Sequence, residues 1–264
     1  MASRGSLVLL VISLAWPGAA AAQSASRSKL EGMWSDPPVT IMARFCASWC
    51  TDAGIERLNA LLDNPANDSR PVAQLSAEAS VFQLDTYIKG RLTPGALASF
   101  PLDPADDPGL LRCEPWGLAR QIFAPHQLEI RRLGPDRMEL HYGEWDARRT
   151  VYMDGRKPGA GQAPSRLGHS NGRWEGDTLV VETSGIAANL TIWRSRHSDR
   201  LRVVERFTRA DDGAMLLLTA TLEDPSTLRE PVVVKRNWRW APTSIIAAYD
   251  ECKPPIAVKK GVEP

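Results

Sequence analysis

The chain has 264 residues, of which 43% are hydrophobic, enough for one large domain or two small ones with a substantial core. It carries 32 Lys and Arg residues against 31 Asp and Glu residues, which gives a formal net charge of +1. Because phosphate binding needs a clear basic excess, this balance argues against a nucleic-acid partner and gives no support for a polybasic membrane anchor.

The first 22 residues have the three parts of a secretory signal peptide. Arg4 gives the positive charge, residues 7–15 form a short apolar run, and residues 20–22 form a cleavage site of three alanines. An uncleaved anchor is the alternative, but the apolar run is too short to cross a bilayer comfortably. The sequence therefore predicts a signal peptide over residues 1–22 and a periplasmic or secreted protein without a membrane span after cleavage.

The chain has four cysteines, and their expected state follows from export. They are Cys46, Cys50, Cys113 and Cys252. An oxidising compartment favours disulfides, and of the three possible pairings the simplest joins Cys46 to Cys50 and Cys113 to Cys252. A metal site at Cys46 and Cys50 is the alternative, but no nearby His or Met completes a ligand set. We expect no metal and no cofactor.

Residues 23–112 are expected to form a helical segment in front of a β-rich region. The pattern predicts irregular structure over residues 23–45, helices over 53–62 and 71–90, and a short helix from Thr93 to Phe100. We interpret this segment as a helical cap packed on a barrel, or as a contact between protomers of a homo-oligomer.

From about residue 127 the apolar residues change from the helical repeat to the alternation typical of strands. The alternating runs are 127–133, 137–145, 148–153, 178–184, 201–208, 214–222 and 231–240. Turn residues separate most runs, and no strand–helix alternation indicates a doubly wound nucleotide-binding fold. The sequence predicts a mainly β fold, an antiparallel barrel or sandwich over residues 113–252, and a flexible tail over 253–264.

Alternation also assigns strand faces. One face would carry Leu201, Val203, Glu205 and Phe207, and another Val232, Val234, Arg236, Trp238 and Trp240. If these faces point inward, Glu205 and Arg236 are buried or line a cavity, where they are candidates to pair with each other. There are two alternatives to a cavity. The two charges could form an ion pair that only fixes the strand register, or both faces could point outward.

The densest group of special residues is the run GHSNGRWEGDTLVVET at positions 168–183. Its centre, residues 174–177, predicts a tight turn that opens the strand 178–184 and leaves Trp174 at one end of the barrel. His169 is the best titratable candidate, since imidazole titrates near neutral pH, and its neighbours predict a mobile loop. The G-x-S-x-G spelling of residues 168–172 lacks the strand–turn–helix context of a nucleophile elbow.

A second group of candidates lies around one predicted strand end. Tyr152 and Asp154 share a strand face, Arg156 follows closely, and Arg149 lies on the opposite face. Asp154 and the glycine after it are also typical of a plain turn. His126 and His141 have no partner that the sequence identifies.

Several of these segments together resemble a group of secreted bacterial proteins with no established activity. They are Cys113-Glu-Pro, residues 149–156 and 168–183, His197-Ser198, Glu205-Arg-Phe207, Asp224-Pro225 and Tyr249-Asp-Glu-Cys252. The hairpin Gly-x-Trp-x-Gly-Asp is also similar to those of lipocalin-type barrels, which implies a lipocalin-like barrel. In the bacterial group a His-Pro pair usually follows Asp-Gly-Arg, whereas Lys157 and Pro158 follow here, so that histidine's role is absent or moved.

Three functions from different classes remain open. The first is a binding module for a small apolar or aromatic molecule, with Tyr152, Arg156, Trp174, Arg236, Trp238 and Trp240 as ligand-binding residues. The second is a cofactor-independent lyase, isomerase or hydrolase that uses His169 with Glu205 or Asp154 as acid and base. The third is a structural or interaction protein in which the helical segment joins protomers.

Overall fold

The computed structural model describes residues 30–35, 52–79, 84–103, 115–123, 126–210 and 213–246. The expected signal peptide, all four cysteines with their expected disulfides, and the expected tail lie outside these residues. None of the described helices is long and apolar enough to cross a membrane.

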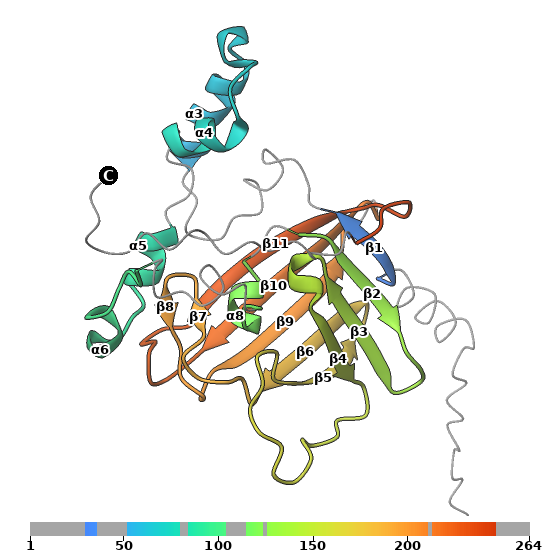
Figure 1. Cartoon of the computed structure of the whole chain (residues 1–264). Coiled ribbons are helices and arrows are strands. Elements are labelled where there is room, and N and C mark those ends of the chain that lie inside the picture. Colours follow the sequence, from blue (N-terminus) through green and yellow to red (C-terminus); the bar gives the residue numbers. More distant parts are fainter. Residues whose placement is uncertain are drawn as a thin grey trace, which may run out of the picture.

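The described strands close into one barrel, with a small hairpin beside it (Figure 1). The barrel strands are β1 (Gly32–Ser35), β2 (Leu128–Arg132), β3 (Arg137–Tyr142), β4 (Arg148–Tyr152), β5 (His169–Glu175), β6 (Thr178–Ser184), β9 (Arg202–Arg209), β10 (Met215–Glu223) and β11 (Val232–Trp240). Their order around the barrel is β1-β11-β10-β9-β6-β5-β4-β3-β2. The hairpin consists of β7 (Thr191–Ile192) and β8 (Ser195–Arg196). The predicted mainly β barrel is confirmed.

One pair of barrel strands is parallel, whereas the sequence suggested an antiparallel barrel throughout. Strands β4 and β5 pair in parallel through Val151 with Ser170 and Tyr152 with Asn171, and the other neighbours in the barrel are antiparallel. A parallel pair needs a long connection, because the chain must return to the same end before the second strand starts. Residues 153–168 supply it, and Figure 1 shows them as a loop that extends beyond the ends of β4 and β5.

Two barrel strands were not expected from the sequence. Strand β1 lies within residues 23–45, which were expected to be irregular, and it pairs with both β2 and β11. Its Trp34 is fully buried and donates its indole N–H to the Leu30 carbonyl at 3.0 Å. Strand β5 replaces the expected loop around His169. Neither strand shows apolar alternation over enough residues to be recognised.

The faces of β9 and β11 whose direction the sequence left open point into the barrel. Val203, Glu205 and Phe207 have no exposed surface, and Arg236 and Trp238 are 6% and 3% exposed. Apolar side chains from all nine barrel strands pack into one core cluster, which the short helix α8 (Leu118–Gln121) joins through Leu118. The core therefore occupies the barrel interior and extends beneath α8.

The remaining helices are short. They are α3 (Asp52–Leu62), η1 (Pro65–Asn67), α4 (Val72–Glu78), α5 (Leu84–Lys89), α6 (Pro94–Leu97) and η3 (Glu144–Asp146). The helix predicted over 53–62 is confirmed, whereas the one predicted over 71–90 corresponds to α4 and α5. Helices α3 and α4 share a small core of their own and stand apart from the barrel in Figure 1, while Tyr87 of α5 accepts a hydrogen bond from Val233 N of β11 at 3.0 Å.

Candidate functional site

The parallel seam between β4 and β5 is the place where several predicted site residues meet. The two strands pair over two residues each, so they diverge on both sides of the seam. A hollow of about 490 Å³ lies where β4 begins, and one of about 500 Å³ lies where β4 ends. His169 lines both hollows, which makes it the residue between them.

His169 is held in place, and this corrects the expectation of a mobile loop. It is the first residue of β5, it is 8% exposed, and its ring stacks on Tyr152 with centroids 5.1 Å apart. Its Nε2 lies 2.9 Å from the carbonyl oxygen of Arg156. Because a carbonyl only accepts, Nε2 must carry the proton, so Nδ1 is the acceptor in the neutral ring.

Arg156 and Asp154 complete this cluster. The Arg156 Nε donates to both Asp154 carboxylate oxygens at 2.9 Å, and its guanidinium lies 4.8 Å from the centre of the Tyr152 ring. The hydrogen bonds from Arg156 lower the pKa of Asp154 to about 2. Asp154 is therefore an anion that is poorly suited to take up a proton near neutral pH.

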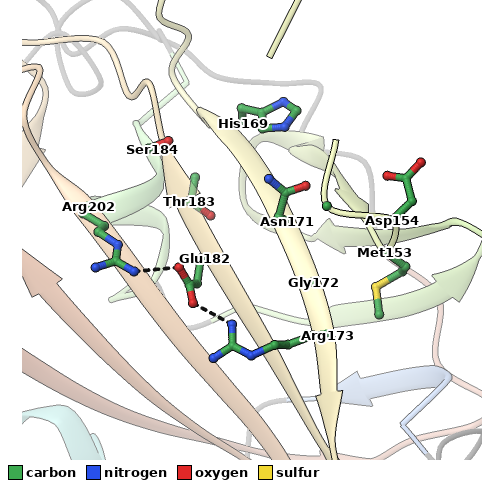
Figure 2. A pocket seen from close by; sticks show the side chains of 11 residues that line it. Met153, Asp154, His169, Asn171, Gly172, Arg173, Glu182, Thr183, Ser184 and Arg202 are labelled. Carbon is green, nitrogen blue, oxygen red and sulfur yellow. Dashed lines mark hydrogen bonds and ion pairs between the residues drawn. The ribbon is translucent and has the colours of Figure 1, made fainter. Parts of the chain in front are cut away.

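The hollow at the end of β4 has a wall of charges that already neutralise one another (Figure 2). Glu182 of β6 lies between two arginines, at 2.5 Å from Arg173 and 2.6 Å from Arg202. Hydrogen bonds from both arginines hold its pKa below the usual value. Asn171 also lines this hollow, and its Oδ1 is buried without a hydrogen-bond partner among the described residues.

The hollow at the start of β4, called the basic hollow below, has a positively charged wall. Its charge comes from Arg148 and Arg166, because the guanidinium of the third arginine in the lining, Arg149, lies inside the barrel; the described part of the lining includes no carboxylate. The lining is Arg148, Arg149, Thr150, Tyr152, Gln162, Ser165, Arg166, Leu167, Gly168 and His169. Arg149 is paired inside the barrel, whereas the partly exposed side chain of Arg148 reaches Asp146 at 3.3 Å on the surface. The hollow therefore combines positive charge with one stacked aromatic pair.

Glu205 does not join His169. It points into the barrel from β9 with no exposed surface, and its Oε2 accepts a hydrogen bond from Arg149 of β4 at 2.6 Å. Arg149 also donates to the Tyr142 hydroxyl at 3.0 Å. Burial acts to lower the pKa of Arg149, but the charges of Glu205 and Tyr142 outweigh it and raise that pKa. The structure corrects the expected partner of Glu205, which is Arg149 instead of Arg236.

The predicted β11 residues lie away from the seam. Arg236 donates to the Ile122 carbonyl at 3.2 Å, and Trp238 donates to the His126 carbonyl at 2.8 Å. Trp240 packs edge-on against Trp34 with ring centroids 4.9 Å apart. Half-buried Trp174 packs against the core from the last part of β5, directly before the turn that the sequence predicted. The structure thus gathers His169, Tyr152, Asp154 and Arg156 and distributes the other candidates over the barrel interior and its ends.

An acid that the sequence reading missed lies beside α8. Glu144 follows β3, is 3% exposed and has its carboxylate against the imidazole Nε2 of His126. Burial raises the pKa of Glu144 to about 7, although Arg120 of α8 acts in the opposite direction. An acid directly after an alternating strand was the available signal, but its burial depends on tertiary packing, which local alternation does not encode.

The described residues include no group of three or more His, Cys, Asp or Glu side chains that could hold a metal ion. The chain matches no protein-family model, no curated protein and no solved structure. The function must therefore be inferred from the geometry of the β4–β5 seam.

Proposed function

We propose that the protein binds a small aromatic carboxylate in the basic hollow beside the β4–β5 seam. The observation that carries this proposal is the lining of that hollow, which brings together arginines, the Tyr152 ring and no carboxylate among the described residues. Arginine is well suited to hold a carboxylate through paired N–H donors, and a tyrosine ring offers a planar surface for an aromatic group. The volume of about 490 Å³ lies in the range of small-molecule sites.

The neighbouring hollow is less suited to an anion. Its two arginines already share Glu182, and the ionised Asp154 adds a second negative charge to the lining. A carboxylate placed there would meet two like charges, which would cost free energy. Charge therefore favours the basic hollow for the ligand.

The proposed role includes export to the periplasm or the cell exterior, where such a protein would meet small molecules from the environment. The signal-like residues 1–22 and the four cysteines support this part. Expression of the full chain in a Gram-negative bacterium, followed by cell fractionation and intact-mass measurement, tests it. We expect the periplasmic fraction to contain a chain that begins at Gln23, and a full-length cytoplasmic product would contradict export.

Binding is tested by calorimetric titration of the purified protein with benzoate and, in parallel, with the neutral benzyl alcohol. We expect benzoate to bind more tightly, and Arg166→Gln to weaken benzoate binding by about 10-fold, the effect of removing one charge-assisted hydrogen bond. Arg137→Gln is the matched control, since Arg137 is an exposed residue at the start of β3 outside the hollow lining. Equal affinity for both compounds, or equal effects of both substitutions, would sink the proposal.

A further inference from the structure

The imidazole of His169 has one nitrogen that the protein holds and one that it leaves open. Nε2 donates its proton to the Arg156 carbonyl at 2.9 Å. Nδ1, the acceptor of the neutral ring, has no hydrogen-bond partner among the described residues, and it is not one of the partnerless polar atoms that are sealed from solvent. Because His169 lines the two hollows beside the seam, Nδ1 opens toward space that a ligand can enter.

The ring has little freedom to turn. His169 is the first residue of β5 (Figure 2), and its backbone pairs with Ser184 of β6. One face of the imidazole stacks on Tyr152 of β4, with the two ring planes 20° apart. Because the Arg156 carbonyl holds one edge of the ring and Tyr152 covers one face, the direction of Nδ1 is set before a ligand arrives.

A carboxylate fits the protonated form of this ring and conflicts with the neutral form. In the neutral ring Nδ1 presents a lone pair, which repels a carboxylate oxygen. In the imidazolium both nitrogens are donors, so Nε2 keeps its hydrogen bond to the Arg156 carbonyl while Nδ1 offers a charge-assisted donor. Protonation of His169 therefore breaks none of the contacts that hold the ring.

The charged groups around the imidazole leave a place for negative charge on one side. On the side of the basic hollow the described charged and titratable groups are Arg148, Arg149, Tyr152 and Arg166. On the side of the other hollow they are Asp154, Arg173, Glu182 and Arg202. The two carboxylates there are already bonded to arginines, Asp154 to Arg156 and Glu182 to its two neighbours in the lining. A ligand carboxylate in the basic hollow would thus add negative charge where the described lining has none.

We propose that a carboxylate in the basic hollow binds together with one proton, which His169 takes up on Nδ1. This coupling rests on the proposed binding function, and it makes His169 the residue through which binding depends on pH. The proton comes from the solvent, forms the Nδ1–H bond, and returns to the solvent when the ligand leaves, so no other reactant is needed. Because imidazole titrates between about pH 5 and 8, the protein should capture a carboxylate in weak acid and release it in weak base.

Proton counting by calorimetry tests the coupling on the unmodified protein. Benzoate is titrated at pH 7 in two buffers that differ in ionisation enthalpy and contain neither carboxylate nor phosphate. The difference between the two heats of binding gives the number of protons taken up. We expect uptake of about half a proton or more per benzoate, and an affinity about 10-fold higher at pH 6 than at pH 8. The neutral benzyl alcohol should cause no proton uptake.

His169→Gln removes the titrating group and keeps an amide N–H donor. In this variant we expect the proton uptake to vanish and the benzoate affinity to be the same at pH 6 and pH 8. His141→Gln is the matched control, because His141 is similarly buried, at 5% exposed, but lies outside the described lining of both hollows. It should keep the proton uptake and the pH dependence. Thermal melting checks that both variants are folded.

The outcomes separate this coupling from the binding function on which it rests. If benzoate binds to the wild type without proton uptake, the coupling is wrong while the proposed binding function stands. Proton uptake that persists in His169→Gln likewise overturns the assignment of the proton to His169. Absence of benzoate binding to the wild type at every pH from 6 to 8 overturns both proposals.

Discussion

At the scale of single residues, the glycines of the run 168–183 have definite structural tasks. Gly168 has φ +69°, and a Cβ there would lie 2.6 Å from the carbonyl oxygen of Ser184. A Cβ on Gly172 would lie 2.6 Å from Met153 Sδ and from a methyl carbon of Val151. Both positions are therefore restricted to glycine, Gly168 by its positive φ and its close approach to β6, and Gly172 by its close approach to residues of β4 and the one that follows it.

Gly172→Ala should destabilise the barrel by about 1–3 kcal/mol, the usual cost of inserting a methyl group into a packed site. The reason is that the new methyl would force Met153 and Val151 away from the short β4–β5 seam. Urea unfolding followed by tryptophan fluorescence measures the change in the free energy of unfolding.

Gly95→Ala is the matched control, since a Cβ on Gly95 of α6 would meet nothing within 4 Å. It should be neutral or slightly stabilising, because alanine restricts the unfolded chain more than glycine does. If the two substitutions have equal effects, close approach at the seam is not what selects Gly172.

At the scale of elements, Asp224 joins the segment before β9 to the end of β10. Its carboxylate accepts hydrogen bonds from Ser198 N at 2.7 Å, Ser198 Oγ at 2.8 Å, Ser226 N at 3.0 Å and Thr227 Oγ1 at 2.8 Å. Burial acts to raise the pKa of Asp224, but these hydrogen bonds outweigh it and lower that pKa below the usual value. The carboxylate therefore stabilises the fold only while it is ionised.

Asp224→Asn should cost about 1–3 kcal/mol at pH 7, since an amide cannot accept all four hydrogen bonds. Because the folded pKa lies below the unfolded one, this stabilisation is present above about pH 4 and is lost as the pH falls through the folded pKa. The difference in stability between the wild type and the variant should accordingly shrink in acid. Denaturant titrations from pH 7 to pH 3 measure it, with the exposed neighbour Asp199→Asn as control. A constant difference across this range would refute the role of the charge.

At the scale of the whole molecule, the buried pair of Arg149 and Glu205 spans the barrel interior between β4 and β9. These strands are not neighbours in the barrel, because β5 and β6 lie between them on the shorter path. The pair thus connects opposite parts of the wall through the core. Removing one partner leaves an uncompensated charge where water cannot reach it.

Glu205→Gln should lower the free energy of unfolding by on the order of 3–5 kcal/mol, because Arg149 would remain charged and buried. Replacing both residues, as Arg149→Met with Glu205→Leu, should cost far less or even stabilise the barrel, since no charge is then buried. Chemical unfolding of the two variants compares them directly. If the single substitution proved as mild as the double one, the interior charge would have to be solvated.

The sequence alone determined the mainly β class, most strands, which residues share a face on β9 and on β11, and the turn before β6. These follow from local alternation and turn chemistry, which a strand carries in its own residues. It also pointed to Tyr152, Asp154, Arg156 and His169, because three of them are close in sequence and the fourth lies in a run of special residues.

Tertiary structure alone decided the rest. Strand β1 is a strand only because β2 and β11 flank it, and β5 only because a long loop brings it back parallel to β4. Glu205 pairs with Arg149 across the barrel, and Glu144 is buried beside His126. Such contacts depend on strand order and barrel closure, which alternation along a single strand does not encode.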